Sequence, residues 1–452
     1  MNWERLLSGK RTGQSVPSKE EHDRSIFQRD YDRLIFSSPF RRLQDKTQVF
    51  PLPGSIFVHN RLTHSLEVAS VGRSLGNNIS QFLKDEEKVK NPLVRELGSV
   101  TAAACLAHDM GNPPFGHSGE KAISLFFKIG EGQKYRELIS DDAVWRDLID
   151  FEGNANALRL LTHQFAGRRK GGFGMTLTTV ASVVKYPYAS GTKGMKKYGF
   201  FQSEKETYLR IADELGLEER PGMPGVFMRH PLVYLVEAAD DICYQVMDIE
   251  DAHKLGIISA AQTRSLFLAF FDSELERDRL ERIEEVCREV TDTNEQIAFI
   301  RALVIGKLVR ECSDIFITNH EAILHGEFKG SLIEALSGAA GEGMKGCVAT
   351  GFDTIYCHPS VKEIEIAGFR ILGSLLKEFT HAVMKPEEHF SGLLLPFIPQ
   401  QYSVKPDAPV HHKIQTVLDF VSGMTDLYAL DLYRKINGQN VTARRFGAFP
   451  TK

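Results

Sequence analysis

The amino-acid sequence predicts a mainly α-helical protein with at most one small β-hairpin. Apolar residues recur at intervals of three and four along most of the chain, which is the pattern of amphipathic helices. Alternating apolar and polar runs, the pattern of half-buried strands, are scarce, and residues 172–180 (GFGMTLTTV) resemble part of a hairpin. The 452 residues include 42% hydrophobic and 25% charged side chains, which is an ordinary balance for a globular protein with a sizeable core.

The expected helices follow one another with turn formers between them. In the first half of the chain we expect helices at about 61–83, 96–109, 117–128, 153–162 and 230–255. In the second half we expect them at about 259–289, 293–318, 359–384 and 411–436. The helix at 96–109 must end where it does, because GNPP follows at once and proline cannot continue a helix.

Two segments are rich in turn formers. Residues 187–199 (PYASGTKGMKKYG) are basic and are expected to form a mobile loop. Residues 337–351 (SGAAGEGMKGCVATG) contain five glycines and are expected to form a linker. We place a soft boundary near residue 260, between a helical core at 25–260 and a C-terminal helical region at 261–452 that completes the fold.

Charge and cysteine usage exclude several classes of protein. The formal charge of −4 argues against a broadly basic nucleic-acid coat. No stretch approaches the ~20 apolar residues of a membrane helix, and the first residues lack a signal-peptide core, so we expect a cytoplasmic protein that does not enter membranes. The six cysteines are scattered without a CxxC pair, so any metal would need His and carboxylate ligands.

A neighbouring His108 and Asp109 stand at the end of an apolar helix, where a ligand pair is easy to reach. His64, in RLTHS, is a further candidate ligand. A lone histidine is more often a hydrogen-bonded core or surface residue, but the combination of imidazole nitrogen and carboxylate oxygen suits Mn²⁺, Fe²⁺, Co²⁺ or Zn²⁺. Such a site leaves coordination positions open for water or phosphate.

The helix at 230–255 carries a polar ridge beside its apolar stripe. Asp240, Tyr244 and Asp248 fall at positions i, i+4 and i+8, so two carboxylates and a phenol line one face. Because this ridge adjoins the core, we favour a functional role for it. Asp241, Glu250 and Asp251 are instead expected to form a solvated acidic face.

The order His64, His108-Asp109, Asp240 is the pattern of HD-domain metal-dependent phosphohydrolases. More narrowly, the sequence resembles the bacterial deoxyguanosine triphosphate triphosphohydrolase (dGTPase) family, in stretches that span most of the chain. These stretches are FSSPFRRLQDKTQVF (36–50), HNRLTHSLEVASVGR (59–73), ACLAHDMGNPPFGHSGE (104–120), EGNANALRLLTH (152–163), KYPY (185–188), FQSEK (201–205), EAADDICY (237–244) and SGMTDLYALDLYR (422–434). The run HDMGNPPFGHSGE is far more specific than a bare His-Asp pair.

The resemblance implies a role for each matching residue. One divalent ion, Mn²⁺ or Mg²⁺ with Co²⁺, Fe²⁺ or Zn²⁺ as alternatives, would be bound by His64, His108, Asp109 and Asp240. His117 and Glu120 would form a catalytic dyad. The implied substrate contacts are Gln48 and Asp248 to the sugar 3′-hydroxyl, Tyr244 to the deoxyribose, and Arg61, Asn112, Lys185 and Lys205 to phosphate.

The implied reaction is hydrolysis of a deoxynucleoside triphosphate (dNTP), dGTP preferred, to deoxynucleoside and inorganic triphosphate. The resemblance also implies a homo-oligomer, a hexamer or tetramer, with the C-terminal region as the interface, and a dNTP effector or single-stranded DNA as further partners. The basic KGMKK (193–197) is expected to be a solvated loop, with a nucleotide or DNA contact as the alternative. Two other functions stay open: another HD-domain phosphohydrolase or phosphodiesterase, and a non-catalytic nucleotide sensor or nucleic-acid-binding scaffold.

Overall fold

The computed structural model describes residues 1–14, 24–50 and 58–439, and the all-α prediction is confirmed within them. These ranges contain isolated β-bridges, such as Arg11 with Thr176, but no strand. The hairpin expected at residues 172–180 is therefore wrong. Glycines with positive φ at 171, 172 and 174 turn the chain, and the Thr176 side chain then caps helix α9 (Leu177–Val183) by accepting from the Thr179 amide.

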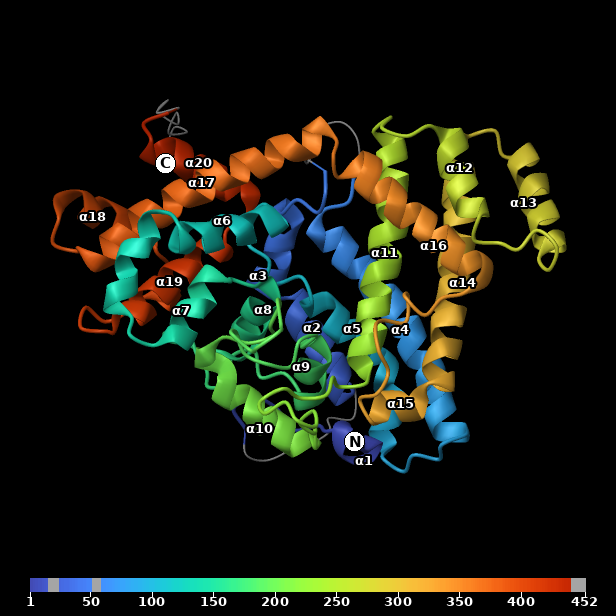
Figure 1. Ribbon diagram of the computed structural model, residues 1–452, viewed down its shortest axis with the longest axis horizontal. Helices are drawn as coiled ribbons and strands as arrows, with labels where there is room; N and C mark the ends of the chain where they lie inside the picture. The colour runs from blue at the N-terminus through green and yellow to red at the C-terminus, as the bar shows by residue number, and fades with distance from the viewer. Residues whose placement is uncertain (15–23, 51–57, 440–452) are drawn as a thin grey trace, which may run out of the picture.

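Three long helices form the centre of the fold. α4 (Arg61–Asp85) packs along α5 (Leu97–Ala107), and α11 (Leu232–Lys254) packs against α4 (Figure 1). A Cβ atom at Gly76 of α4 would lie 2.3 Å from the Thr101 hydroxyl of α5, so glycine is needed for this close approach. The apolar stripe predicted for the α11 segment is buried, as expected.

The remaining helices surround this centre. In the first half they are α1 (Trp3–Leu6), α2 (Ile26–Ile35), α3 (Ser38–Arg41), α6 (Gly116–Lys128), α7 (Asp142–Ile149), α8 (Gly153–Thr162) and α10 (Lys205–Leu215). In the second half they are α12 (Ala260–Leu268), α13 (Arg277–Glu289), α14 (Thr293–Thr318), α15 (His320–Leu324), α16 (Gly338–Thr350), α17 (Pro359–Met384), α18 (His389–Leu394), α19 (Val410–Ser422) and α20 (Asp426–Ile436). Short 3₁₀ turns η1 to η4, η6 and η7 lie at Arg42–Asp45, Pro92–Glu96, Glu131–Leu138, Gln202–Glu204, Leu395–Phe397 and Gln400–Tyr402.

Two expected helices are each divided in two. Residues 259–289 form α12 and α13, because the Asp272 carboxylate accepts from the amides of Glu274 and Leu275 and turns the chain. Residues 411–436 form α19 and α20, which meet at Gly423, and the Thr425 hydroxyl caps α20 by accepting from the Tyr428 amide.

The linker expected at residues 337–351 is wrong, because these residues form α16. A Cβ atom at Gly343 would lie 2.7 Å from the Phe270 ring, so glycine here allows close helix packing instead of flexibility. α16 continues into a π-helical turn, η5 (Gly351–Ile355), which leads to the long helix α17.

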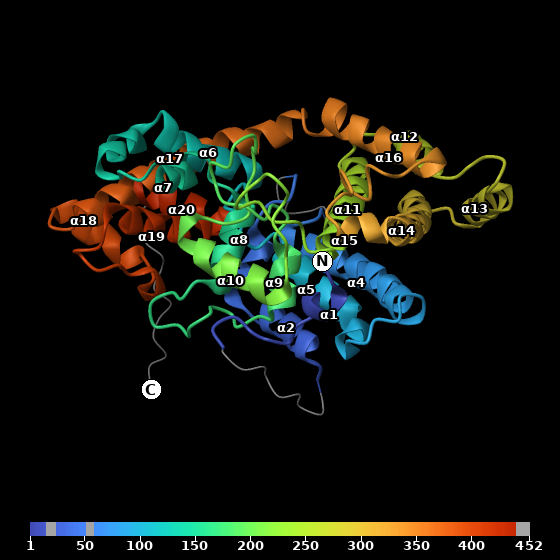
Figure 2. The same ribbon diagram turned by 60° about the horizontal axis from the view of Figure 1, so that its bottom comes forward.

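The described residues form two apolar clusters, and α17 contributes to both. The first cluster is built around α4, α5, α11 and α14 and includes Val361 near the start of α17. The second joins α6 and α7 to α19 and α20 and includes Ile371 and Leu372. Figure 2 shows α17 running from the side of α12 and α16 to the side of α18 and α19. No helix in the described chain is both long and apolar enough to cross a membrane.

Candidate active site

A cavity of about 520 Å³ lies between the end of α5, the start of α6, α11 and the start of α17. Ten of the thirteen residues that we singled out as site candidates line it. They are Gln48, Arg61, His108, Asp109, Asn112, His117, Glu120, Lys185, Asp240 and Tyr244. The other three do not line it: His64 contacts the lining residue Asp240, and Asp248 and Lys205 lie outside the cavity wall.

The proposed metal ligands meet at one end of this cavity although they come from three helices. His64 Nε2 on α4 lies 3.0 Å from Asp240 Oδ1 on α11. His108 Nε2, after α5, lies 3.4 Å from the same oxygen and 3.6 Å from Asp109 Oδ1. The Asp240 side chain keeps 32% of its surface exposed, so the group opens onto the cavity.

The donor atoms of this group suit a divalent cation. His108 Nδ1 donates to the Cys105 carbonyl oxygen at 2.6 Å, so Nε2 carries the lone pair. Nε2 is buried and has no hydrogen-bond partner among the described residues. Burial disfavours the imidazolium, yet Asp109 and Asp240 raise the pKa of His108 to about 9. A cation bound here would take the place of that proton.

A second group of candidate ligands, Glu87, His320 and Glu321, is unsuitable for a metal. Trp3 Nε1 donates to His320 Nε2 at 2.8 Å, so the neutral ring carries its proton on Nδ1. The nitrogen that faces the two glutamates therefore offers no lone pair.

His117 and Glu120 form a hydrogen-bonded pair at the start of α6. His117 Nδ1 lies 2.7 Å from Glu120 Oε2, and the Gly153 amide donates to Glu120 Oε1 at 2.7 Å. Burial opposes ionisation of Glu120, but the contact with His117 holds the pKa of this carboxyl below its ordinary value. Glu120 is therefore an anion that keeps the His117 proton on Nδ1 and leaves Nε2 available for proton exchange.

Two lining residues contact a proposed metal ligand directly. Arg61 donates to Asp109 Oδ2 at 2.7 Å, and Asn112 Nδ2 donates to Asp109 Oδ1. Arg61 is buried at the first position of α4. Both side chains therefore orient Asp109 and face the same cavity.

The sugar-side candidates are separated by a tyrosine that the sequence analysis missed. Gln48 and Tyr244 line the cavity, and Gln48 Oε1 is buried with no hydrogen-bond partner in the described chain. Asp248 does not line it, because Tyr356 covers the carboxylate and donates its hydroxyl hydrogen to Oδ2 at 2.8 Å. The Tyr356 ring stacks on Tyr244 with 5.9 Å between centroids. Tyr356 follows the π-helical turn η5, beyond the segment 337–351 that was expected to be a linker, and no motif in the sequence singled it out.

The cations of the cavity differ in part from those expected. Lys185 lines it, but its Nζ lies 3.0 Å from Glu237 Oε1. Lys121 and Lys197 also line it. The sequence offered a signal for Lys197 alone, as a member of the basic KGMKK run.

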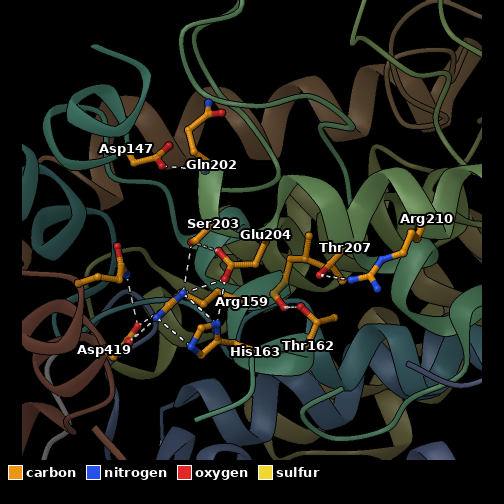
Figure 3. A network of polar contacts seen from close by, with 12 residues as sticks. Asp147, Arg159, Thr162, His163, Gln202, Ser203, Glu204, Thr207, Arg210 and Asp419 are labelled. Carbon is orange, nitrogen blue, oxygen red and sulfur yellow. Dashed lines mark hydrogen bonds and ion pairs between the residues drawn. The ribbon is translucent and has the colours of Figure 1, made fainter. Parts of the chain in front are cut away.

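Lys205 is an exception to the expected phosphate contacts, because it is exposed at the start of α10 and does not line the cavity. The residue before it, Glu204, turns inward and accepts from Arg159 at 2.8 Å (Figure 3). This buried contact fixes the chain direction that leaves Lys205 facing outward.

The solvated acidic face expected on α11 is wrong. Glu250 and Asp251 are buried: Glu250 pairs with Lys254 at 2.8 Å and with Arg301 of α14, and Asp251 Oδ2 accepts from the His59 amide at 2.7 Å. Asp241 lines the cavity, and burial, together with Asp240, raises its pKa to about 7. Neighbours from distant segments cover this side of the helix, so spacing along α11 could not predict its exposure.

The chain is similar to known proteins over nearly its whole length. Residues 61–186 match the HD domain, and residues 342–435 match a phosphohydrolase-associated domain. A Synechocystis protein named deoxyguanosinetriphosphate triphosphohydrolase-like is 37% identical over 450 residues, which cover 97% of this chain and 99% of that protein. A Pseudomonas aeruginosa protein of the same name is 35% identical over 460 residues, with coverage of 97% and 99%.

A Yersinia pseudotuberculosis protein named deoxyguanosinetriphosphate triphosphohydrolase is 30% identical over 503 residues, which cover 93% of this chain and 96% of that protein. The similarity thus extends over nearly the whole chain and includes the helices that surround the cavity. The chain belongs to the deoxyguanosinetriphosphate triphosphohydrolase-like family of HD-domain phosphohydrolases.

Proposed function

We propose that the protein hydrolyses dNTPs, with dGTP preferred, to deoxynucleoside and inorganic triphosphate in a metal-dependent reaction. One observation carries the proposal: a single cavity of about 520 Å³ brings together a His/Asp group, a His–Glu pair and lysines. A triphosphate with about four negative charges needs both a metal and nearby cations.

The proposed metal would be held by His64, His108, Asp109 and Asp240. When bound, a divalent ion polarises phosphoryl oxygen and favours ionisation of water. We propose Mn²⁺ or Mg²⁺, and the two imidazoles keep Co²⁺, Fe²⁺ and Zn²⁺ as alternatives. Arg61 and Asn112 would keep the Asp109 carboxylate in place.

His117 would move the proton that hydrolysis requires. Attack at the α-phosphorus needs one group to accept a proton from water and another to protonate the leaving 5′ oxygen. With its Nδ1 proton held by Glu120 at 2.7 Å, His117 can do either through Nε2. A pH–rate profile of His117→Asn against the wild type identifies the role, since loss of the acidic limb indicates a base and loss of the alkaline limb an acid.

Sugar and base recognition would use the other end of the cavity. The unpartnered Gln48 Oε1 can accept from a 3′-hydroxyl, and the Tyr244 ring forms a wall that excludes a 2′-hydroxyl. Asp248 would contact the sugar only after Tyr356 gives up its hydrogen bond. The Glu365 carboxylate also lines the cavity and pairs with Lys362 at 2.9 Å. If it accepted from the adjacent N–H donors of guanine in competition with that ammonium, it would favour dGTP as the substrate.

The phosphate contacts would come from Arg61, Asn112 and Lys185, as the resemblance implies, together with Lys121 and Lys197. Lys185 pairs with Glu237, so a bound triphosphate must compete with that carboxylate. The side chain of Lys197 is exposed at the cavity wall, where its ammonium lies 5.9 Å from the centroid of the Tyr186 ring, and it offers a further cation. Lys205 has no place in this set.

Product analysis tests the proposal. Incubation of dGTP with the protein and Mn²⁺ or Mg²⁺ is expected to yield deoxyguanosine and tripolyphosphate, and dGMP or dGDP as the product would refute the proposed bond cleavage. Replacement of His108 and Asp109 by alanine is expected to abolish Mn²⁺ binding and turnover together. Glu342→Gln, at an exposed carboxylate that pairs with Lys345, is the matched control and is expected to retain both.

The same assays separate the alternatives. Hydrolysis of a cyclic or signalling nucleotide without release of triphosphate would favour another HD phosphohydrolase or phosphodiesterase. Stoichiometric nucleotide binding without turnover under any of these metals would favour a sensor or scaffold.

We further propose a cytoplasmic homo-oligomer, a hexamer or tetramer, whose interface lies in the C-terminal region at 261–452, with the core at 25–260. Sedimentation analysis tests the assembly. Assays of the four dNTPs, alone, in pairs and with single-stranded DNA, test for an effector.

A further inference from the structure

A buried carboxylate on α20 contacts two segments of the cavity wall from behind. Asp426, the first residue of α20, is 6% exposed. Its Oδ2 accepts from the Thr47 amide at 2.8 Å, and its Oδ1 accepts from the Phe115 amide at 3.0 Å. Both carboxylate oxygens are thus used by backbone groups that lie 379 and 311 residues away in the sequence.

Each of these amides adjoins a residue of the proposed site. Thr47 precedes Gln48, the proposed sugar contact, and Phe115 lies two residues before His117. Phe115 has a φ of 62°, in the left-handed region that a non-glycine residue rarely adopts, so this turn needs support from outside. Asp426 supplies that support at the residue where the loop turns into α6.

The chain just before α20 adds contacts to the same loop. The Lys46 ammonium donates to the carbonyl oxygens of Asn112 at 2.6 Å and Ser422 at 2.9 Å. The side-chain Nδ2 of Asn156 donates to the Gly111 carbonyl oxygen at 2.7 Å and to the Ser422 hydroxyl at 3.2 Å. The loop that follows Asp109 is therefore held directly by Asp426, and it is joined to Ser422 through the side chains of Lys46 and Asn156.

We infer that Asp426 is a positioning residue: its two hydrogen bonds set the distance between Gln48 on the sugar side and His117 on the reacting side of the cavity. The inference rests on the proposed function for its kinetic consequence. A displacement of about 1 Å between a substrate and a catalytic group lowers the rate by about 10²-fold. The proposed metal ligands lie on α4, at the end of α5 and on α11, and none of them contacts Asp426 among the described residues.

Asp426→Asn tests the inference, because it keeps the shape of the side chain and replaces one acceptor oxygen by a donor. We expect kcat for dGTP to fall about 10- to 100-fold, while Mn²⁺ affinity in titration calorimetry stays within about threefold of the wild type. Hydrogen exchange should become faster at the Thr47 or the Phe115 amide. Asp431→Asn is the control, because Asp431 is an exposed residue of α20 that pairs with Lys435, and it should change none of these values.

Three results would overturn the inference. The first is a wild-type kcat in Asp426→Asn and also in Asp426→Ala. The second is unchanged exchange at both amides in these variants. The third is a loss of Mn²⁺ affinity as large as the loss of kcat, which would indicate general disruption of the site. The exchange measurement needs no turnover, so it decides the role of Asp426 even if the wild type releases no triphosphate and the proposed function fails.

Discussion

The buried ion pair between Arg159 and Asp419 predicts a large loss of stability when the aspartate is removed. Arg159 on α8 donates from Nε to Asp419 Oδ1 and from Nη2 to Oδ2, both at 2.7 Å, in a bidentate contact with α19 (Figure 3). Each of the two side chains is 6% exposed. The pair therefore joins two parts of the chain that are 260 residues apart without competition from water.

The size of the loss follows from what remains around Arg159. Removal of one partner of a buried ion pair costs about 3–5 kcal/mol. In Asp419→Ala the Arg159 charge still meets Glu204 at 2.8 Å, so we expect the lower end of that range, about 3 kcal/mol. In Asp419→Asn one acceptor oxygen remains for Nε, and we expect about 2 kcal/mol.

Urea unfolding followed by circular dichroism measures this free energy. Glu342→Ala, which removes an exposed partner of Lys345, is the control and should cost less than about 1 kcal/mol. The double variant Arg159→Met with Asp419→Leu should lose more stability than Asp419→Ala, because it also leaves the buried Glu204 carboxylate with only His163 and Ser203 as partners in the described chain. A loss in Asp419→Ala no larger than that of the control would refute the reasoning.

Three further predictions concern Lys197, Asp147 and Gly111. Lys197→Ala should raise KM for dGTP about 3- to 10-fold with little change in kcat, because it removes an exposed cation from the cavity wall. An unchanged KM in steady-state assays at low salt would exclude a contact between Lys197 and the triphosphate. Burial raises the pKa of Asp147 to about 7. The folded state therefore binds more protons than the unfolded state between about pH 4 and 7. As the pH rises through that window, the free energy of unfolding of the wild type should fall by roughly 2–4 kcal/mol relative to Asp147→Asn. Urea unfolding at about pH 5 and 8 measures this, and parallel pH profiles of the two proteins would contradict the prediction. Gly111→Ala should lower the free energy of unfolding by at least about 2 kcal/mol, because the added Cβ would lie 2.1 Å from the Gly153 carbonyl oxygen. Thermal melts measure this, and a wild-type melting temperature would show that the loop around Gly111 can move aside.

The local parts of the fold could be predicted from the sequence. Apolar spacing predicted the helical class and the segments of α4, α5 and α11, since a helix presents every third and fourth residue to one neighbour. Chain order and resemblance likewise singled out His64, His108, Asp109 and Asp240, and these side chains lie close together, although His64 does not itself line the cavity.

The same spacing failed where a neighbour decides the outcome. The glycines of α16 resembled a linker because their sequence does not reveal the Phe270 ring that packs against them. Glu250 and Asp251 looked solvated until partners from distant segments covered them. Exposure is a property of packing, and periodicity describes one helix at a time.

What the sequence determined by itself is therefore the helical class, the segments of the central helices α4, α5 and α11, and the His and Asp side chains that lie together beside the cavity. Only the tertiary structure decided that Tyr356 covers Asp248, that Lys205 faces outward while Lys197 reaches the cavity wall, and that Asp426 accepts from the Thr47 and Phe115 amides. The physical reason is that hydrogen bonds between segments more than 100 residues apart depend on the angle and distance at which helices pack, and no spacing along the chain encodes these quantities directly.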